Sequence, residues 1–443
     1  MSRLALGPEE AHPLVDGLLG SLPGPPVARA IHADDEMLAV AVEREDGDLD
    51  RGFASYFCDG WRVATSMQQI AMALGGFARL GSVLDFASGY GRATRFLARR
   101  LDPARLWVAE IDPQAVEFQG ATFGVHALQS AADPAAFVCP QTFDLIYAVS
   151  LFTHLPSPAF HAWLRRLSEL LRPSGLLALT VHDFCLLPPG HPRPPDGFVF
   201  EPTSESGTLA PQSYGSTWVS EGFLRRAAAE AAPGLAVRRI ALGLGGYQDV
   251  YLLARRSQAE LDALPYDPGP HGFLERAGVE SGRLRLSGWA TGWPGGSRLA
   301  AVRAWLDGRL AAETPGGVDR PDLAALHGEA ARRSGFALAL ELPRRPRHGS
   351  SVLSVKAASE SGVEALLHFG TVETALLRSA RGEAVAAVHE RFRREEAEHE
   401  ARHLAVRVEE LEARIAAMRR SRFWRIRDAW FAVKRALGWT REM

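Results

Sequence analysis

The sequence has little cysteine, almost no net charge and no long apolar run. Its 443 residues include three cysteines, far apart and without a CxxC pair, so we expect neither a disulfide framework nor a metal site. The formal net charge of -2 gives no overall attraction to nucleic acid or acidic lipid. No segment reaches about 18 uninterrupted apolar residues, and the first residues lack the pattern of a signal peptide. These absences favour a cytoplasmic protein that neither crosses a membrane nor enters the secretory route.

The length and composition predict several packed domains. Hydrophobic residues make up 47% of the chain and charged residues 23%, which is typical of soluble globular proteins, and the length suits roughly two to four domains. The expected order is an N-terminal, loosely structured lead-in (1–50), an α/β domain (51–255), a linker (256–281), an all-β sandwich (282–372), a coiled coil (376–419) and a basic amphipathic helix (420–443).

Alternating strand and helix patterns define the α/β domain. Nearly continuous apolar runs predict buried strands, and amphipathic segments between them predict helices, so we expect a parallel sheet covered on both faces. The expected strands are 82–86, 105–110, 123–128, 143–149 and 174–181, with two further strand-like runs, LAVRRIAL and QDVYLLAR, before 255. The expected helices are one that ends at Gly75 and Gly76, then 91–101, 113–119, 157–172 and one from about Ser220.

The last third of the chain changes character. Short alternating runs between Gly, Pro and Asp-Gly signals predict the antiparallel sandwich. Heptad spacing over 376–419 predicts a coiled coil and hence a homodimer, with a solvated single helix as the alternative. The final helix surrounds Trp and Phe with Arg and Lys, which suits either a membrane surface, through 421–439, or a protein partner.

A turn of small residues follows the first predicted strand, in the stretch VLDFASGYGR. Ala87, Ser88 and Gly89 let a ligand approach the backbone closely at the carboxyl end of the sheet. About 20 residues later Glu110 ends the second strand, where a carboxylate can accept both hydroxyls of a ribose, and Ile111 offers an apolar face to a base. Such a pattern suits a dinucleotide, S-adenosylmethionine or a purely structural turn. The bulky, basic GRATRF and the preceding Asp85 favour the sulfonium cofactor over a pyrophosphate.

The first 255 residues resemble class I S-adenosylmethionine-dependent methyltransferases. VLDFASGYGR, VAEIDP, FDLIYAVSLFTHLP and LLRPSGLLALTVH occur in the order that this family uses. The resemblance implies a Rossmann-like, seven-stranded sheet and S-adenosylmethionine as cofactor. Two positions depart from the family pattern: Ala87 replaces the first glycine, and QSAADP lacks the acid that reads adenine. The cofactor-binding residues implied are Asp85, Ala87, Ser88, Gly89, Tyr90, Glu110, Ile111, Ala131, Ala148, Val149 and Ser150, with a contact near Ser130 also considered.

Two histidines are candidates for chemistry on the acceptor. His182, just past the fifth strand, is the candidate general base, with a loop or packing role as the alternative. His154 either contacts the substrate or buttresses the turn after the fourth strand. The long segment 183–219 is typical of loops that cover a site, and its Glu205 and Tyr214 are candidates to bind a hydroxylated acceptor.

The accessory regions indicate the class of acceptor. SLFTHLP lacks the Asn/Asp-Pro-Pro-aromatic motif of nucleic-acid amino methyltransferases, and no basic groove is apparent, so we expect no nucleic-acid partner. LSGWATG and RAWLDGR resemble a module that accompanies bacterial enzymes of cell-surface glycan assembly, and the SRFWRIRDAWFAVKRALG tail resembles the end of enzymes in polysaccharide pathways. The resemblance implies a methyltransferase, of the O-methyltransferase type, for a sugar hydroxyl in a surface polysaccharide or its precursor, held peripherally at the inner face of the membrane. The alternatives are a small-molecule methyltransferase and a non-catalytic scaffold.

Overall fold

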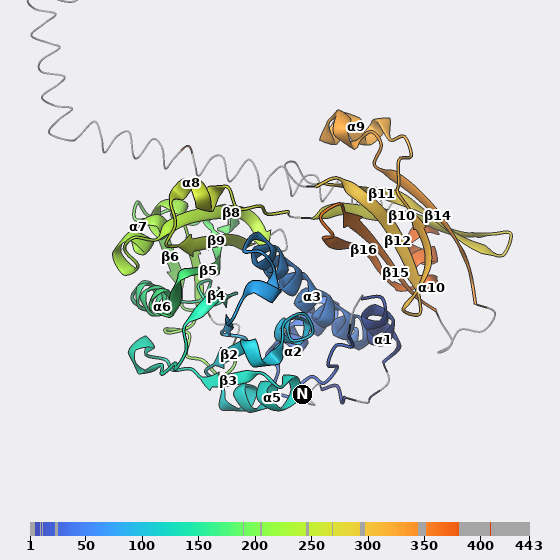
Figure 1. Ribbon diagram of the computed structural model, residues 1–443. Helices are drawn as coiled ribbons and strands as arrows, with labels where there is room; N and C mark the ends of the chain where they lie inside the picture. The colour runs from blue at the N-terminus through green and yellow to red at the C-terminus, as the bar shows by residue number, and fades with distance from the viewer. Residues whose placement is uncertain are drawn as a thin grey trace, which may run out of the picture.

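The computed structural model describes most of the chain up to residue 380. The described residues are 5–380, without 9, 11, 23–24, 189, 204–205, 245–247, 268, 293–296 and 344–350, together with residue 408. Two regions stand side by side: an α/β region and a sandwich of strands (Figure 1).

The α/β region is built on one mixed sheet. Within the described residues nine strands join in the order β3-β2-β1-β4-β5-β7-β6, and β5 also pairs antiparallel with β9, which pairs with β8. The pairs among β1 to β5 are parallel. These strands are β1 (Val83–Phe86), β2 (Leu106–Glu110), β3 (His126–Gln129), β4 (Phe143–Ala148), β5 (Leu171–Asp183), β6 (Phe198–Glu201), β7 (Ser216–Val219), β8 (Ala236–Leu244) and β9 (Gln248–Ala254). The predicted Rossmann-like sheet, followed by further antiparallel sheets, is confirmed.

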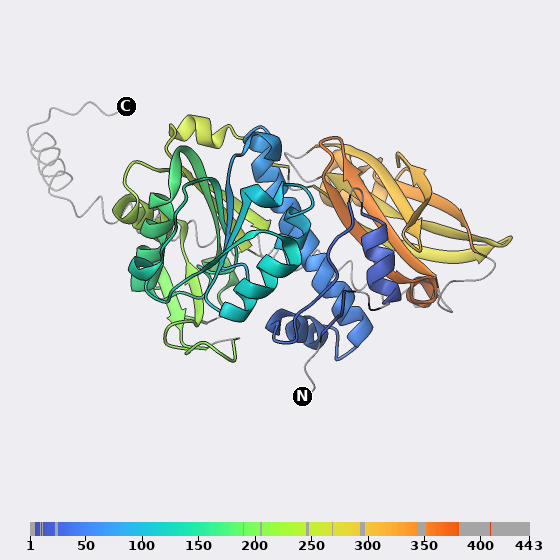
Figure 2. The ribbon, with the colours of Figure 1, turned by 60° about the horizontal axis from the view of Figure 1, so that its bottom comes forward.

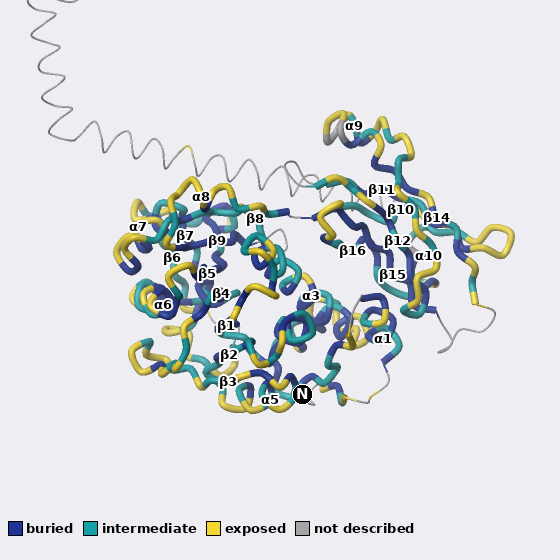
Figure 3. The backbone as a smooth tube through the Cα atoms, in the orientation of Figure 1, coloured by how far each residue is buried: buried dark blue, intermediate teal, exposed yellow. Residues whose placement is uncertain are grey.

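Helices cover both faces of this sheet, because successive side chains of a strand point to opposite sides. Val83 packs into the apolar cluster beneath α3, whereas its neighbour Leu84 packs into the cluster beneath α6 and α7. The strands at the centre of the sheet are accordingly buried (Figure 3). The helices are α3 (Leu49–Ala73), α4 (Thr94–Leu97), α5 (Pro113–Phe123), α6 (Ser157–Glu169) and α7 (Glu221–Ala231), with 3₁₀ turns η1 (Phe77–Arg79), η2 (Pro103–Arg105), η3 (Pro134–Ala136) and η4 (Phe184–Leu186).

The N-terminal stretch is more ordered than predicted. Where composition indicated a loosely structured lead-in, the chain forms α1 (Pro13–Gly20) and α2 (Glu36–Arg44), each with a side-chain cap at its first turn. Arg95, buried beside the cofactor turn, donates to the carbonyls of Ala28 and Ala30. Tertiary contacts of this kind are invisible to local composition, which explains the wrong expectation.

The C-terminal region is a sandwich of a three-stranded sheet, β10-β11-β14, and a four-stranded sheet, β13-β12-β15-β16. Its first strand lies inside the predicted linker. A proline can begin a strand without losing a ladder bond, and β10 is only half buried, so it lacks a strong apolar pattern. The elements from 256 onward are α8 (Gln258–Asp262), β10 (Pro270–Glu280), β11 (Arg283–Gly292), β12 (Leu299–Leu306), β13 (Arg309–Thr314), α9 (Pro321–His327), η5 (Glu329–Ala331), β14 (Gly335–Glu341), β15 (Val352–Ser359), β16 (Glu364–Thr371) and α10 (Val372–Ala380).

The sandwich packs directly against the N-terminal helices, on the side of α1 and α3 (Figure 2). Lys356 of β15 is 1% exposed; its Nζ lies 2.8 Å from the Ser21 carbonyl and over the ring of Trp61. Burial lowers the pKa of Lys356 to about 8, and Glu364 acts against that shift. Since a buried ammonium group needs such partners, this contact joins the two regions through a specific interface.

The predicted coiled coil and terminal basic helix lie outside the described residues, apart from α10 at the start of the former and residue 408. Among the described helices, none is long and apolar enough to cross a membrane.

Candidate functional site

The turn after β1 curls back on itself. Ala87, Gly89 and Gly91 all have positive φ, at 58°, 56° and 77°. A Cβ on Gly91 would lie 2.3 Å from Phe123, so this position packs against α5, whereas a Cβ on Gly89 would meet nothing within 4 Å. Gly91 is therefore required for packing, while Gly89 leaves open space at the carboxyl end of β1.

Glu110 faces this turn from the end of β2. Its two carboxylate oxygens accept separate backbone hydrogen bonds, one from Gly89 at 2.7 Å and one from Ile111 at 2.6 Å. Burial raises the pKa of Glu110, and these backbone donors oppose the shift. Each carboxylate oxygen has a second lone pair, so Glu110 can hold the turn and still accept a ribose hydroxyl.

Side chains behind the turn hold Ser88 and Tyr90. Gln119 of α5 donates to the Ser88 hydroxyl and to the Gly89 carbonyl, each at 2.8 Å. The Tyr90 hydroxyl donates to Asp112 at 2.6 Å, and its ring stacks on His32 with centroids 4.8 Å apart. The turn is thus shaped in advance, as a ligand cradle requires.

Asp85 lies beneath the turn. It accepts a 2.8 Å hydrogen bond from the Thr94 hydroxyl, and burial raises its pKa to about 6. The resemblance implies that Asp85 borders the methionine part of the cofactor, and its hydrogen bond to Thr94 holds the carboxyl group in place beneath the turn.

The residues predicted to contact the far end of the cofactor lie after β2 and β3. Ser130 donates its backbone N–H to the Glu110 carbonyl at 2.7 Å, and Gln129 donates to the Ile111 carbonyl at 2.5 Å. Ile111 and Ala131 are both half buried, so each presents apolar surface beside the turn.

The arrangement fits S-adenosylmethionine on the geometry of the turn. Gly89 leaves the space that a ligand needs, Glu110 has acceptor capacity for a ribose, and Ile111 supplies an apolar surface. The residues that would hold the cofactor lie on adjacent parallel strands, because β1 pairs with β2 on one side and with β4 on the other.

The end of β4 supplies a second group of predicted residues. Ala148 is fully buried and Val149 half buried, while Ser150 has a φ of 58° and receives a hydrogen bond on its side chain from Gln248 at 3.1 Å. The Ser150 N–H donates to the Thr180 hydroxyl at 2.8 Å. Ser150 is therefore fixed from two neighbouring strands.

His182 lies near the end of β5, in the same polar group. Gln248 Nε2 is 3.4 Å from His182 Nε2, so the amide can donate to an unprotonated ring nitrogen. Burial, followed by the nearby His154, lowers the pKa of His182 to about 4. The imidazole is therefore neutral across the physiological range. Because β4 separates β5 from β1, this group lies about 10 Å across the sheet from the turn.

His154 and Tyr214 form the outer wall beside His182. Their rings stack with centroids 4.5 Å apart, and His154 Nδ1 donates to the Gly215 carbonyl at 2.7 Å. Trp218 of β7 lies 6.1 Å from the His182 ring. The segment after β5 returns here, and elsewhere it reaches α2, where the Gly207 N–H meets Glu36 at 3.0 Å. Glu205, the other predicted residue, lies outside the described residues.

Sequence reasoning missed Gln248 and Gln119. Gln248 opens the run QDVYLLAR, which was identified only as a strand, and it is 98 positions from Ser150. Gln119 lies in a predicted helix with no motif around it. Among the described residues, no group of three or more metal-ligating side chains occurs.

Comparison with known proteins agrees with this geometry. Residues 83–175 match the family described as a methyltransferase domain. No curated protein matches the sequence.

The chain is also similar in part to several solved methyltransferase structures. A DhpI-SAH complex is 16% identical, with a TM-score of 0.33, and the match covers 50% of this chain and 97% of that one. The magnesium protoporphyrin IX methyltransferase from Synechocystis with bound SAM is 16% identical, with a TM-score of 0.31 and coverage of 44% and 80%. A methyltransferase from Clostridium acetobutylicum is 12% identical, with a TM-score of 0.36 and coverage of 50% and 99%.

The family match covers the turn, Glu110 and the end of β4. The N-terminal half of the chain therefore contains a class I S-adenosylmethionine-dependent methyltransferase domain. The enzyme class is methyltransferase, and its cofactor is S-adenosylmethionine.

Proposed function

We propose that this protein transfers a methyl group to a hydroxyl of a sugar in a surface polysaccharide or its precursor. The observation that carries the proposal is the polar group of Ser150, His182 and Gln248, at the same end of the sheet as the turn after β1. It combines hydrogen-bonding groups for a hydroxylated acceptor with a neutral imidazole that can receive a proton.

When bound, the cofactor supplies an electrophilic methyl group on a sulfonium. The protein's contribution is alignment of the acceptor oxygen, which by itself supplies much of the rate of a displacement reaction. In the free protein Gln248 donates to His182 Nε2, which favours the tautomer with this nitrogen unprotonated. When the acceptor binds, its hydroxyl replaces the Gln248 amide at the one lone pair of Nε2, and this nitrogen then takes the hydroxyl proton. With a pKa of about 4 the ring is a weak base but is always in the receptive state at neutral pH.

The aromatic residues near Ser150, His182 and Gln248 favour a sugar acceptor over a charged one. His154, Tyr214 and Trp218 are half-buried rings near His182, and an aromatic ring suits the apolar C–H face of a pyranose. The sandwich supports the same proposal through its resemblance to modules of glycan-assembly enzymes. A homodimer through 376–419 and membrane contact through 421–439 complete the proposal as partners of the domain.

An acceptor panel tests the proposal. The full chain is incubated with methyl-labelled S-adenosylmethionine and either nucleotide sugars, lipid-linked oligosaccharides and isolated polysaccharide, or small phenols and amines, with Glu110→Ala as the inactive control. We expect label in a sugar fraction as an alkali-stable methyl ether. Transfer only to small molecules would support the small-molecule alternative, and cofactor binding without transfer to any member of the panel would support the scaffold.

A further inference from the structure

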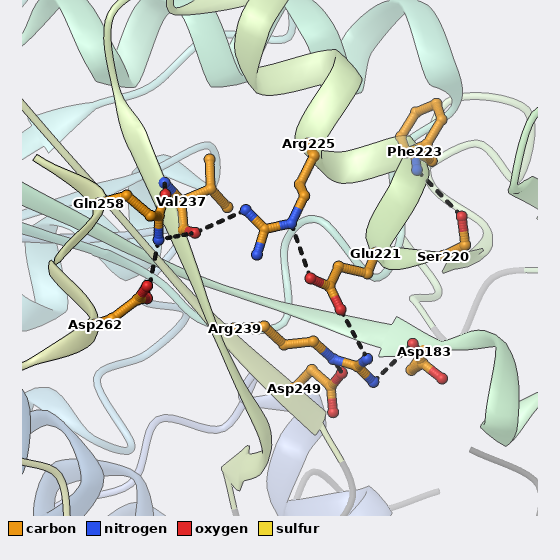
Figure 4. Close-up of polar contacts among 10 residues, drawn as sticks. All are labelled: Asp183, Ser220, Glu221, Phe223, Arg225, Val237, Arg239, Asp249, Gln258 and Asp262. Carbon is orange, nitrogen blue, oxygen red and sulfur yellow. Dashed lines mark hydrogen bonds and ion pairs between the residues drawn. The ribbon is translucent and has the colours of Figure 1, made fainter. Parts of the chain in front are cut away.

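A buried arginine gathers three carboxylates behind the acceptor side of the site (Figure 4). Arg239 of β8 meets Asp249 at 2.5 Å, Asp183 at 3.0 Å and Glu221 at 3.3 Å. Its side chain is 9% exposed, and those of Asp183 and Asp249 are 3% and 1% exposed. A single guanidinium therefore ties the end of β5, the start of β9 and the first turn of α7 to β8.

The sequence places this cluster directly beside the polar group. Asp183 follows His182 and Asp249 follows Gln248, and successive side chains on a strand point to opposite faces. The two aspartates face Arg239, while their neighbours His182 and Gln248 approach each other at 3.4 Å. The β5–β9 ladder ends at the pair Val181 and Asp249, so backbone pairing with β9 does not extend to His182.

Burying several charged side chains costs free energy unless they pair with one another. Removing one partner of such a buried group strongly destabilises the fold. The network also includes an exposed member, since Arg225 donates to the other oxygen of Glu221 at 2.8 Å. Arg225 contacts the Val237 carbonyl as well, at 2.9 Å (Figure 4). Arg225 thus offers a matched control, because it shares Glu221 with Arg239 and otherwise contacts the Val237 carbonyl.

We propose that Arg239 is a positioning residue, which sets the separation of His182 and Gln248 by holding the aspartate next to each. The inference rests on the proposed role of these two residues in the acceptor site. It concerns the spacing of β5 and β9 beyond their last mutual pair, where His182 and Asp183 pair with β7 and Gln248 pairs with β8. This spacing is a property of the free protein.

The test follows the His182 ring by NMR in the full chain with ¹⁵N-labelled histidine, assigned with His182→Asn. The groups that titrate or carry charge around this ring are His154 on its own side and the Asp183 cluster behind it. In Arg239→Met the strand ends separate and the ring gains water, so its pKa should rise from about 4 to above about 5. Arg225→Met should leave it unchanged.

A second variant separates positioning from simple charge. Asp183 Oδ1 also accepts the Cys185 N–H at 2.9 Å. Asp183→Asn therefore keeps the contact with Cys185 and loses the ion pair with Arg239. Removal of a negative charge alone would lower the pKa of His182, whereas loss of position would raise it through hydration. A rise in Asp183→Asn supports the proposal, and it decides the matter if Arg239→Met does not fold.

An unchanged or lowered pKa in Asp183→Asn would overturn the proposal, as would an unchanged pKa in a folded Arg239→Met. S-Adenosylmethionine affinity should stay within about threefold in all three variants, because none touches the cofactor turn. Neither readout uses an acceptor, so failure of the sugar hypothesis would show only in the acceptor panel and would be distinguishable from failure here.

Discussion

The proposed cofactor half and the proposed acceptor half of the site are built in different ways. The cofactor half, from Asp85 to Asp112, is held by contacts between residues close in sequence, such as Gly89 with Glu110, 21 positions apart. The acceptor half joins Ser150, His182 and Gln248, of which the first and last are 98 positions apart. Residues in a local motif are recognisable from the sequence, whereas residues that meet only across the sheet leave no local pattern.

Replacement of Glu110 should have the largest effect, and this effect should fall on cofactor binding. Glu110→Ala removes the ribose acceptor and two backbone contacts, each a charge-assisted hydrogen bond. We expect S-adenosylmethionine affinity to fall about 100-fold, or roughly 3 kcal/mol, in calorimetry. Glu110→Gln, which keeps one acceptor oxygen, should lose less. Wild-type affinity in Glu110→Ala would contradict the site assignment.

The two glycines of the turn should respond in opposite ways. Gly91→Ala brings a Cβ within 2.3 Å of Phe123 and should destabilise the fold by about 2–3 kcal/mol in denaturant unfolding. Gly89→Ala has free space and should cost only about 1 kcal/mol for its positive φ, yet weaken cofactor binding. The open-cradle reading fails if Gly89→Ala binds the cofactor normally.

His182→Asn should affect turnover alone. We expect a loss of about 30-fold in methyl transfer, with cofactor affinity unchanged, since the ring is on the acceptor side. With a folded pKa of about 4, wild-type transfer should be flat from pH 6 to 9 and decline only below about pH 5 as the ring protonates. A rate inflection near pH 6.5 that vanishes in His182→Asn would show instead a solvated ring.

Asp85 should show its burial in the pH dependence of stability. Its pKa is about 6 in the folded state against 3.8 unfolded, so the folded state binds more protons between these values. Stability from this group is present below pH 4 and is lost as pH rises through 6, by about 1–3 kcal/mol. Asp85→Asn keeps an acceptor for the Thr94 hydroxyl. The difference in unfolding free energy between this variant and wild type should therefore favour the variant more at pH 8 than at pH 4. Equal differences at both pH values would refute the raised pKa.

Ala87→Gly should have the smallest effect. An alanine with a φ of 58° is strained by about 1–2 kcal/mol, and the larger chain entropy of glycine offsets part of the relief. We expect a net gain of about 0.5 kcal/mol in unfolding free energy and no change in cofactor affinity. A loss of stability would indicate that the methyl group packs productively.

The fold was largely predictable because local sequence patterns specify it, and the same patterns carry the prediction of the cofactor turn. Apolar runs fixed the strands around Val83 and Leu106, and small residues followed by an acid at Glu110 identified the turn. Gln248 and Arg239 were not predictable, because nothing in the residues beside them shows which distant strand they will face.

The same reason explains the two wrong expectations about structure. The N-terminal stretch is ordered by partners such as Arg95 rather than by its own composition, and β10 acquires its pairing from β11 despite a weak pattern. Tertiary contacts override local signals most readily where those signals are weak.

The most direct test is a calorimetric titration of S-adenosylmethionine into wild type, Glu110→Ala and His182→Asn under one set of conditions. The account predicts equal binding to wild type and His182→Asn and about 100-fold weaker binding to Glu110→Ala. Equal losses in both variants, or no binding to wild type, would contradict a cofactor half that works independently of the acceptor half.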